Sequence, residues 1–371
     1  MSAKPIGVGI VGVQPGRSWA AVAHIPALQT LPSDYRVVGV ANTSLQSAQK
    51  AVAAIGVGEA FESVQALAAS PDVDLVVVTV KVPHHLEIVT AVLEAGKAVY
   101  CEWPIGNGLA EAQAMTKLAQ ARGVAAFAGT QARAAPAMRY VADLIAQGYV
   151  GEVLSSTLVG NGRPLGAATI DQQSAYCLDS KNGATILTVP FGHTMAAIAD
   201  ALGPIETLDA RLATRRPSVL VRETGEMLPM RAPDQVLVAA TLESGAPFSA
   251  HYRGGAPRGV GFLWEIHGTK GDLQITGVSG HAQVGDMVVK GAAGDEPTLS
   301  ELPIPQAYQF PQPLTAPVNN VVAMYQLIAA DLKTGSRTAP TFADALRTHE
   351  LLAAIERSAQ EGRTVKVAEV A

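Results

Sequence analysis

A glycine-rich turn near the N-terminus carries groups suited to holding a phosphate. Gly12 lets the chain leave a strand sharply, and the backbone donors of the turn precede a helix that starts at Ala20. The literal Gly-x-Gly-x-x-Gly at 7–12 lies mostly inside the strand, whereas a dinucleotide fingerprint belongs in the turn that follows. We therefore expect a pyrophosphate site rather than an ordinary strand–helix loop. Its residues are Gly12, Val13, Gly16, Arg17, Ser18 and Trp19.

The second predicted strand ends without the acidic residue that would hold the ribose diol of NAD. The sequence there is Asn42-Thr43-Ser44, whose side chains can donate hydrogen bonds to a 2′-phosphate. No arginine stands beside them. The pattern favours NADP or dual use of both cofactors, with NAD as the alternative.

A histidine and a lysine are the candidate groups for proton transfer. His193 precedes a predicted helix, and a histidine accepts a proton from an alcohol near neutral pH without a large pKa shift. Lys81 follows a buried strand, at the edge where doubly wound folds bind ligands, and could contact cofactor phosphate or the reacting hydroxyl. The alternatives are a helix-capping or interface histidine and a solvated surface lysine.

Other side chains that could take part in chemistry indicate a site that binds a ring and argue against a metal site. Trp103 offers an indole face to a nicotinamide or sugar-like ring, although it could equally fill a domain interface. His84 and His85 are adjacent, so on a helix their side chains point about 100° apart and are poorly placed to share an ion. Cys101 and Cys177 are too few for a thiolate metal site. We expect no bound metal.

The elements that would position these groups change character near residue 131. Before it, apolar strand-like runs alternate with helical segments, which predicts a parallel sheet covered by helices on both faces. Right-handed crossovers then give a doubly wound, Rossmann-type domain over residues 1–131. The expected strands are 6–13, 35–41, 75–80, 98–101 and 125–128, and the expected helices are 20–31, 45–54, 63–69, 85–95 and 109–121.

From 132 to 371 the pattern predicts a second α/β domain with a large open, mostly antiparallel sheet. Few regular helices separate its strand-like segments, and turn residues are common. The expected strands are 153–160, 205–214, 235–242, 248–253, 261–268, 272–276 and 364–367, and the helices are 136–147, 194–202, 321–333 and 342–361. Residues 280–303 are Gly-rich and weakly patterned, so we expect a surface excursion there.

Composition excludes several classes of protein. Of 371 residues, 48% are hydrophobic and 16% charged, which excludes a disordered chain and, at this length, predicts two domains. The net charge of −5 and the lack of a basic run argue against nucleic-acid binding. No uncharged apolar stretch approaches the roughly 18 residues of a membrane span, and no signal peptide is evident. We expect a cytoplasmic protein.

Several motifs resemble the glucose–fructose oxidoreductase/inositol dehydrogenase family (Gfo/Idh/MocA), and the resemblance covers nearly the whole chain. The segments that carry it are Thr79–His85, Ala95–Pro104, Leu144–Gly148, Gly151–Val153 and Pro340–Leu346. Within the family, the chain looks like the branch of the fungal galactose-pathway repressor and its bacterial relatives. The segments that match that branch are Gly16–Trp19, Val80–Pro83, Phe191–Thr194, Arg253–Pro257 and Ile266–Leu273.

The resemblance implies a Rossmann domain followed by an α/β domain whose open sheet joins copies into a homo-oligomer, a dimer or tetramer. His193 matches the catalytic histidine of the family. The implied substrate contacts, besides Trp103, are Arg133, Arg163, Tyr176 and Asp179, each of which could equally form a surface ion pair or another local contact. The expected cofactor contacts outside the turn and the Asn42–Ser44 segment are Val80, Lys81, His85, Glu102, Trp103 and Gln131.

Two departures from the family affect the chemistry. Family dehydrogenases carry Glu-Lys-Pro, with the lysine beside the nicotinamide, where this chain has Glu102-Trp103-Pro104. They also carry an aspartate four residues before the histidine, where this chain has Val189. The usual acid–base set is therefore reduced to one member.

Three functions fit these features. The first, which we favour, is an NAD(P)-dependent oxidoreductase acting on a hydroxyl or carbonyl of a sugar-like or cyclic alcohol, with His193 and Lys81 at the reacting centre. The second is a non-catalytic nucleotide-binding regulator that resembles the galactose repressor. The third is a redox-neutral enzyme, such as a lyase or a glycoside-cleaving enzyme, with tightly bound NAD. The compact, Ala-rich chain lacks the long insertions of the fungal repressor, which favours the enzyme.

Overall fold

The computed structural model describes residues 4–310 and 314–370. By its internal contacts the chain divides into two compact units. The first comprises the chain through Gln131 together with Pro317–Leu346, and the second comprises Ala132–Ala316 with the chain from Arg347 onward. The segment Pro317–Leu346 therefore packs with the N-terminal sheet, whereas the sequence pattern predicted one continuous second domain over residues 132–371.

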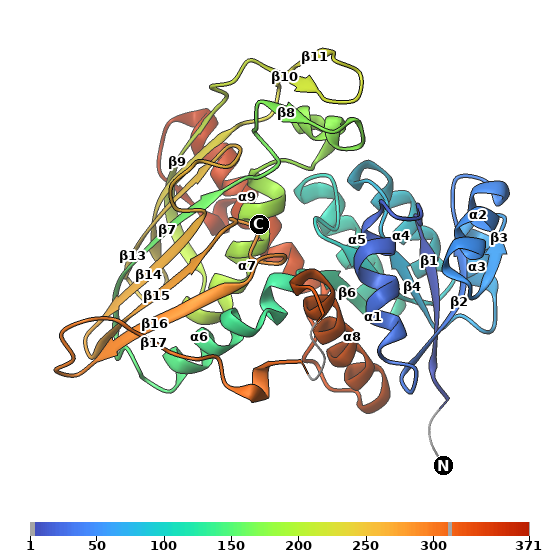
Figure 1. Ribbon diagram of the computed structural model, residues 1–371, viewed down its shortest axis with the longest axis horizontal. Helices are drawn as coiled ribbons and strands as arrows, with labels where there is room; N and C mark the ends of the chain where they lie inside the picture. The colour runs from blue at the N-terminus through green and yellow to red at the C-terminus, as the bar shows by residue number, and fades with distance from the viewer. Residues whose placement is uncertain (1–3, 311–313, 371) are drawn as a thin grey trace. The chain divides into compact units, whose positions relative to one another are not determined.

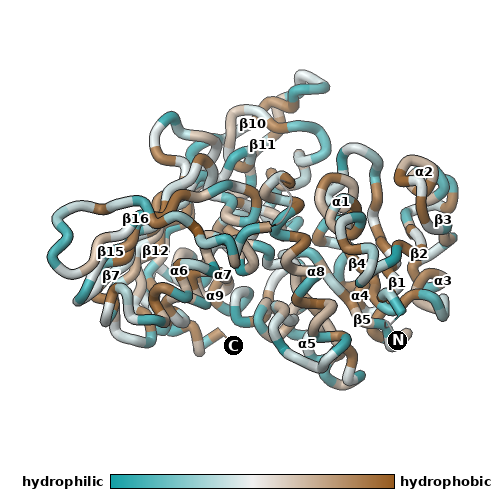
Figure 2. The backbone as a smooth tube through the Cα atoms, turned by 60° about the horizontal axis from the view of Figure 1, so that its bottom comes forward, coloured by the Kyte–Doolittle hydropathy of each residue, from teal (hydrophilic) through white to brown (hydrophobic). Residues whose placement is uncertain are grey.

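The first unit is built on a six-stranded sheet in the order β3-β2-β1-β4-β5-β6, with every pair parallel. This is the strand order of a doubly wound dinucleotide-binding fold and confirms the predicted fold class. Figure 2 shows the hydrophobic colour along the central strands such as β4, which is buried at every position. The strands are β1 (Ile6–Val11), β2 (Tyr35–Ala41), β3 (Glu59–Phe61), β4 (Leu75–Val78), β5 (Ala98–Glu102) and β6 (Ala126–Gly129).

The helices of this unit include one that returns late in the chain. That helix, α8, reaches the sheet through Tyr325, whose backbone carbonyl accepts from the Tyr35 hydroxyl at 2.6 Å. A Lys333–Asp34 ion pair joins its far end to the turn before β2. The helices are α1 (Ile25–Gln29), α2 (Leu45–Ile55), α3 (Val64–Ala69), α4 (His85–Glu94), α5 (Leu109–Arg122) and α8 (Ala316–Thr334).

The second unit is built on a nine-stranded sheet in the order β17-β16-β15-β14-β7-β13-β12-β9-β18. Only the β13–β7 pair among these described strands is parallel, so the predicted open, mostly antiparallel sheet is confirmed. The strands are β7 (Val153–Asn161), β9 (Ile205–Ala213), β12 (Gln235–Leu242), β13 (Pro247–Arg253), β14 (Phe262–Gly268), β15 (Gly271–Gly277), β16 (Met287–Ala293), β17 (Ser300–Glu301) and β18 (Val365–Lys366).

Helices cover one face of this sheet (Figure 1). They are α6 (Pro136–Ala146), α7 (Gly192–Leu202) and α9 (Phe342–Glu361). The alternation of the strands turns their apolar side chains to these helices: Tyr252 on β13 is fully buried and donates to Thr194 on α7 at 2.8 Å. The Ser358 hydroxyl on α9 accepts from the backbone N–H of Ala210 at 2.9 Å.

A small sheet that the sequence pattern did not predict projects from the same unit. It has the order β11-β10-β8, with bounds Thr169–Ile170 for β8, Ser218–Val221 for β10 and Met227–Pro229 for β11. A separate hydrophobic cluster lies beneath it, formed by Ile170, Leu178, Val219, Val221 and Met230. Its strands are two to four residues long, too short for a periodic signal to stand out.

Two local predictions were wrong in informative ways. The first strand ends at Val11 rather than at Val13, because Gly12 adopts a φ of +99° that turns the chain out of the sheet. Residues 280–303 are not a surface excursion throughout, because residues 280–283 are buried and Met287–Ala293 forms β16. Its pairing with β15 is a contact that composition does not reveal.

Candidate functional site

The predicted nucleotide turn lies at the point where the strand order of the first sheet reverses. Gly12 follows β1, and Thr79 follows the adjacent β4, so both lie at the carboxyl edge where doubly wound folds bind ligands. A Cβ on Gly12 would lie 2.8 Å from a methyl of Val80, which leaves room for glycine alone. The Thr79 hydroxyl donates to the Val11 carbonyl at 2.9 Å and closes the two strand ends together.

The turn is held from within by Ser18. Its buried hydroxyl accepts from the backbone N–H of Gln14 at 2.9 Å and donates to the carbonyl of the same residue at 3.1 Å. Gly16 at the tip has a φ of +70° with open space around it, and Arg17 is exposed. The chain then enters a single π-helical turn over Ala20–His24, a geometry frequent at functional sites. Ser18 therefore shapes the turn, and the backbone N–H groups of Gln14, Arg17 and Ser18 all form hydrogen bonds within it.

Asn42 joins the end of β2 to the same turn. Its carboxamide oxygen accepts from the Val13 N–H at 2.9 Å, and its nitrogen donates to the Val13 carbonyl at 2.9 Å and to the Ser47 hydroxyl at 3.1 Å. Ser44 caps α2 by accepting from the Ser47 N–H at 3.2 Å. The structure thus brings Val13 and Asn42 together, as a site built from both strand ends requires.

A carboxylate at the end of β5 gathers donors from distant segments. Glu102 accepts from the Gln131 carboxamide at 2.6 and 2.8 Å and from Nε2 of His24 at 2.9 Å. The Nδ1 atom of His24 lies 2.8 Å from the Tyr325 hydroxyl, and the imidazole is fully buried. A Cβ on Gly129 would lie 2.7 Å from the carboxylate, so this position has to be glycine. Sequence reasoning found Glu102 and Gln131 but missed His24.

His85 is a structural link between two strand ends. Its ring is buried, with Nε2 at 2.9 Å from the Val80 carbonyl and Nδ1 at 2.9 Å from the Pro104 carbonyl. Burial lowers the pKa of His85 despite these acceptors. Lys81 is exposed at the start of a short 3₁₀ turn, and Trp103 is buried beside a cis peptide bond to Pro104. His85 therefore joins the two segments that carry Lys81 and Trp103.

The second unit places His193 in a buried setting. The side chain is only 4% exposed at the start of α7, after a π-helical turn over Leu187–Phe191. Burial and the nearby His281 lower the pKa of His193 to about 3, so the imidazole is neutral across the physiological range. The position of the family aspartate is occupied by Val189, which is half-buried.

A second buried histidine, missed by sequence reasoning, belongs to the same region. His281 is 8% exposed, and burial lowers its pKa to about 4 although hydrogen bonds to the Gly162 and Arg163 carbonyls act in the other direction. Gln283 lies beside it, with the carboxamide nitrogen 3.2 Å from Nδ1. The available signal was a polar Ser-Gly-His-Ala-Gln run inside a segment flanked by apolar strands.

Two of the residues predicted to bind substrate, Arg133 and Asp179, form ion pairs within the second unit. Arg133 forms a two-point ion pair with Asp200, at 2.6 and 2.8 Å. Asp179 caps a 3₁₀ turn by accepting from the Lys181 N–H and lies 3.6 Å from Arg231. Burial raises the pKa of Tyr176, which is half-buried, whereas Arg163 is exposed next to a cis peptide bond. Their role in binding substrate stays a prediction.

Within the described residues, 4–310 and 314–370, no group of three or more histidine, cysteine, aspartate or glutamate side chains is arranged to hold a metal ion. None of the helices there combines the length and the hydropathy that crossing a membrane would take.

Two family models match the chain in tandem. Residues 6–130 match the oxidoreductase family with an NAD-binding Rossmann fold, and residues 136–277 match the C-terminal domain of Gal80p. The first match covers β1 through β6, and the second begins at α6 and ends at β15.

Whole-chain comparisons give relatives of two kinds. Dehydrogenase aclE of Aspergillus oryzae is 33% identical over 74% of this chain and 78% of its own length. The galactose/lactose metabolism regulatory protein GAL80 of Saccharomyces cerevisiae is 27% identical over 100% of this chain and 96% of its own. The solved structure of the transcriptional regulator Gal80p from Kluyveromyces lactis superimposes with a TM-score of 0.89, at 28% identity, and covers 100% of this chain and 96% of its own.

The two buried histidines predict a loss of stability in acid. An unfolded histidine takes up a proton below about pH 6.5, whereas His193 and His281 stay neutral in the folded chain until about pH 3 and 4. The unfolded state therefore binds more protons, and the unfolding free energy falls as the pH drops from about 6.5 towards 4. Each histidine contributes a slope of about 1.4 kcal/mol per pH unit, measured by urea unfolding.

The matched variants are His193→Asn with His281→Gln, which should flatten this slope, and the exposed His84→Gln, which should leave it unchanged. An equal slope in the wild type and in the double variant would contradict the assignment.

Proposed function

Because the chain belongs to the Gfo/Idh/MocA oxidoreductase family, with its NAD-binding Rossmann fold, we propose that it is an NAD(P)-dependent oxidoreductase of a sugar-like or cyclic secondary alcohol. The observation that carries this proposal is the strand order of the first unit, with a glycine turn at its switch point, in a chain that has His193 at the position of the family's catalytic histidine. The imidazole of His193 is neutral at physiological pH, which is the state that accepts a proton, and the low pKa that burial gives it makes it a weak base.

The first unit fits a dinucleotide on the residues it presents. The Gly12–Trp19 turn at the switch point would hold the pyrophosphate, and the Asn42–Ser44 segment would surround the adenosine ribose. At the end of β6, the buried Gln131 carboxamide oxygen and Thr130 hydroxyl have no hydrogen-bond partner among the described residues, as expected for atoms that face a polar ligand group. A bound nicotinamide would supply the hydride acceptor.

Side chains of the protein would then accept the proton of the alcohol and stabilise the reacting oxygen. His193 would accept it at a ring nitrogen as the hydride leaves, which removes the cost of forming an alkoxide. Lys81, exposed after β4, would supply positive charge near the cofactor or the reacting oxygen. The buried Trp103 would offer an apolar face to the ring of the substrate.

Replacing the base tests the proposed chemistry. His193→Asn keeps the size of the side chain but removes the titrating group, so turnover should fall by about 10²–10⁴-fold while nucleotide affinity stays within about twofold. The assay screens secondary alcohols, including sugars and cyclic diols, for NAD(P)H absorbance. His267→Asn, at an exposed residue of β14, is the control. Full turnover in His193→Asn would show that another group is the base.

A substitution at the end of β2 tests whether the cofactor that binds there carries a 2′-phosphate. Asn42→Asp keeps an acceptor for the Val13 N–H but loses the donor to the Val13 carbonyl and adds a negative charge. The dissociation constant for NADP should therefore rise more than that for NAD, because a carboxylate repels a 2′-phosphate and accepts from a ribose diol. Calorimetric titration with both nucleotides measures this. An unchanged ratio of the two constants would place the ribose elsewhere.

A non-catalytic, nucleotide-binding regulator is the second candidate. The replacement of the family lysine and aspartate by Trp103 and Val189, together with the full-length similarity to a regulatory protein, favours it. The double variant Trp103→Lys with Val189→Asp restores the family set. A wild-type protein that binds nucleotide but is inert, and that gains turnover in this variant, would support the regulator.

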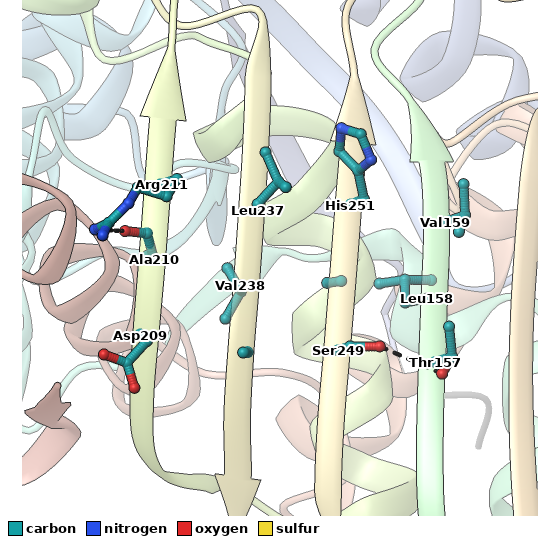
Figure 3. A pocket seen from close by; sticks show the side chains of 12 residues that line it. Thr157, Leu158, Val159, Asp209, Ala210, Arg211, Leu237, Val238, Ser249 and His251 are labelled. Carbon is teal, nitrogen blue, oxygen red and sulfur yellow. Dashed lines mark hydrogen bonds between the residues drawn. The ribbon is translucent and has the colours of Figure 1, made fainter.

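We also propose that the chain forms a homo-oligomer through the bare face of the nine-stranded sheet. Figure 3 shows side chains of β7, β9, β12 and β13 on that face. They line a pocket of about 440 Å³. It includes the exposed Leu237 between Arg211 and His251, an apolar and polar mixture typical of an interface between subunits. Both cysteines are buried thiols that form no disulfide within the described residues, which suits a reducing, cytoplasmic compartment.

Light scattering after gel filtration tests the interface. Leu237→Arg would bury an unpaired charge, so the oligomer of the wild type should dissociate to monomers. Val278→Arg, at a residue 83% exposed on a loop, is the matched control. A wild-type monomer, or an oligomer unaffected by Leu237→Arg, would contradict the proposed interface.

A further inference from the structure

The carboxylate of Glu102 is held in one place by its surroundings. It ends β5, and Nε2 of His24 lies 2.9 Å from its Oε1 atom, so this nitrogen carries a proton and donates. The His24 ring is fully buried, and its Nδ1 lies 2.8 Å from the Tyr325 hydroxyl, so both nitrogens are engaged. A Cβ on Gly129, in the neighbouring strand β6, would lie 2.7 Å from the same carboxylate oxygen. Glu102 therefore presents its oxygens in a fixed direction.

The carboxylate in turn determines which way the Gln131 carboxamide points. The carboxamide nitrogen lies 2.6 and 2.8 Å from the two oxygens of Glu102 and bridges them. A carboxylate only accepts hydrogen bonds, so a carboxamide oxygen in the same place would be repelled. The Tyr100 hydroxyl, 3.3 Å from the nitrogen, is a further partner. The nitrogen of Gln131 therefore faces Glu102, and its oxygen points away from the carboxylate.

The oxygen of this carboxamide is an acceptor that the protein does not satisfy. Gln131 is fully buried, and no donor among the described residues reaches its Oε1 atom. The hydroxyl of Thr130, which is 1% exposed, also has no partner within residues 4–310 and 314–370. Buried acceptors are nearly always paired in folded proteins, because an unpaired one has lost its hydrogen bonds to water. A group that is not part of the chain, a ligand or a water, has to supply the donor.

The place of Gln131 in the sheet indicates which part of a dinucleotide it would meet. The strand order reverses between β1 and β4, and a dinucleotide lies across this switch point with one half over each side of the sheet. Asn42 contacts the glycine turn from the end of β2, on the side that holds the adenosine half in this fold. Glu102 and Gln131 follow β5 and β6, on the other side of the turn. They therefore lie on the side of the nicotinamide half.

We propose that Gln131 recognises the carboxamide of the nicotinamide by accepting a hydrogen bond from its NH₂ group, and that Glu102 is the positioning residue that keeps the Gln131 oxygen turned toward the cofactor. The carboxamide of nicotinamide offers N–H donors, which this acceptor needs. It is also uncharged, which suits a place near the Glu102 carboxylate. The proposal rests on the cofactor site of the proposed function and concerns binding alone, so it does not depend on turnover.

Calorimetric titration of the wild type with three nucleotides that differ at one group tests the recognition. The probes are NAD, its 3-acetylpyridine analogue, in which a methyl replaces the NH₂ group, and its deamidated analogue, in which a carboxylate replaces the carboxamide. The corresponding 2′-phosphates are used if the chain prefers NADP. The acetylpyridine analogue should bind about tenfold more weakly than NAD, because it leaves the Gln131 oxygen unpaired. The deamidated analogue should bind about 100-fold more weakly, because it also brings a negative charge toward Glu102.

Substitution of the positioning residue tests whether orientation matters. In Glu102→Gln, His24 holds the new oxygen and the new NH₂ group faces Gln131, so the Gln131 carboxamide turns its nitrogen toward the ligand. The preference for NAD over the deamidated analogue should then fall by about tenfold or more. Gln131→Met removes the acceptor and should bring NAD and the acetylpyridine analogue to equal affinity. Glu94→Gln, the same change as Glu102→Gln at an exposed residue of α4, is the matched control and should keep the wild-type preferences.

Three results would overturn the proposal. Equal affinities of the wild type for NAD and the acetylpyridine analogue would show that a water, rather than the cofactor, pairs with the Gln131 oxygen. Unchanged preferences in a folded Glu102→Gln variant would show that Glu102 does not set the orientation. A wild type that binds none of these nucleotides would remove the ligand altogether. If Glu102→Gln fails to fold, the titrations of the wild type and Gln131→Met still decide. A chain that discriminates among the three nucleotides but oxidises no alcohol would contradict the proposed function and support this inference.

Discussion

The carboxylate of Glu102, at the end of β5, requires hydrogen-bond donors, and distant segments of the first unit supply them. A charge largely removed from water without partners would cost roughly several kcal/mol. Glu102 takes its donors from His24 before α1 and from Gln131 after β6, and His24 contacts Tyr325 on the returning helix α8. Segments far apart in the sequence are thereby fixed at the carboxyl edge of the sheet, where a dinucleotide would bind.

In the second unit the buried ionisable group is the imidazole of His193, which stays neutral. His193 has no carboxylate four residues before it, and the neighbouring buried side chain that acts on it is another histidine. Two buried imidazoles stay neutral because neither is offered a countercharge. The chain lacks the family lysine and aspartate but keeps the histidine of the usual acid–base set. This histidine is buried and neutral, and its low pKa makes it a weak base.

The sequence predicted what local pattern determines. Tyr35–Ala41 and Phe342–Glu361 were predicted with their observed bounds, because apolar periodicity and end signals mark them. The Gly12–Trp19 turn was expected at its observed place because a strand, a glycine and a helix follow one another. The contacts that organise the site were not predictable. Val13 bonds Asn42 across 29 residues, His24 bonds Glu102 across 78, and Thr194 bonds the loop of His281 across 86.

The most direct test of the account follows the hydride itself. Wild-type protein is incubated with NAD⁺ or NADP⁺ and with a panel of secondary alcohols that carry deuterium on the hydroxyl-bearing carbon. The nucleotide is then analysed by mass spectrometry. The account predicts that at least one alcohol transfers deuterium to the nicotinamide ring, and that His193→Asn reduces this transfer by about 10²-fold or more. Nucleotide that binds and is recovered without deuterium from every alcohol would contradict it.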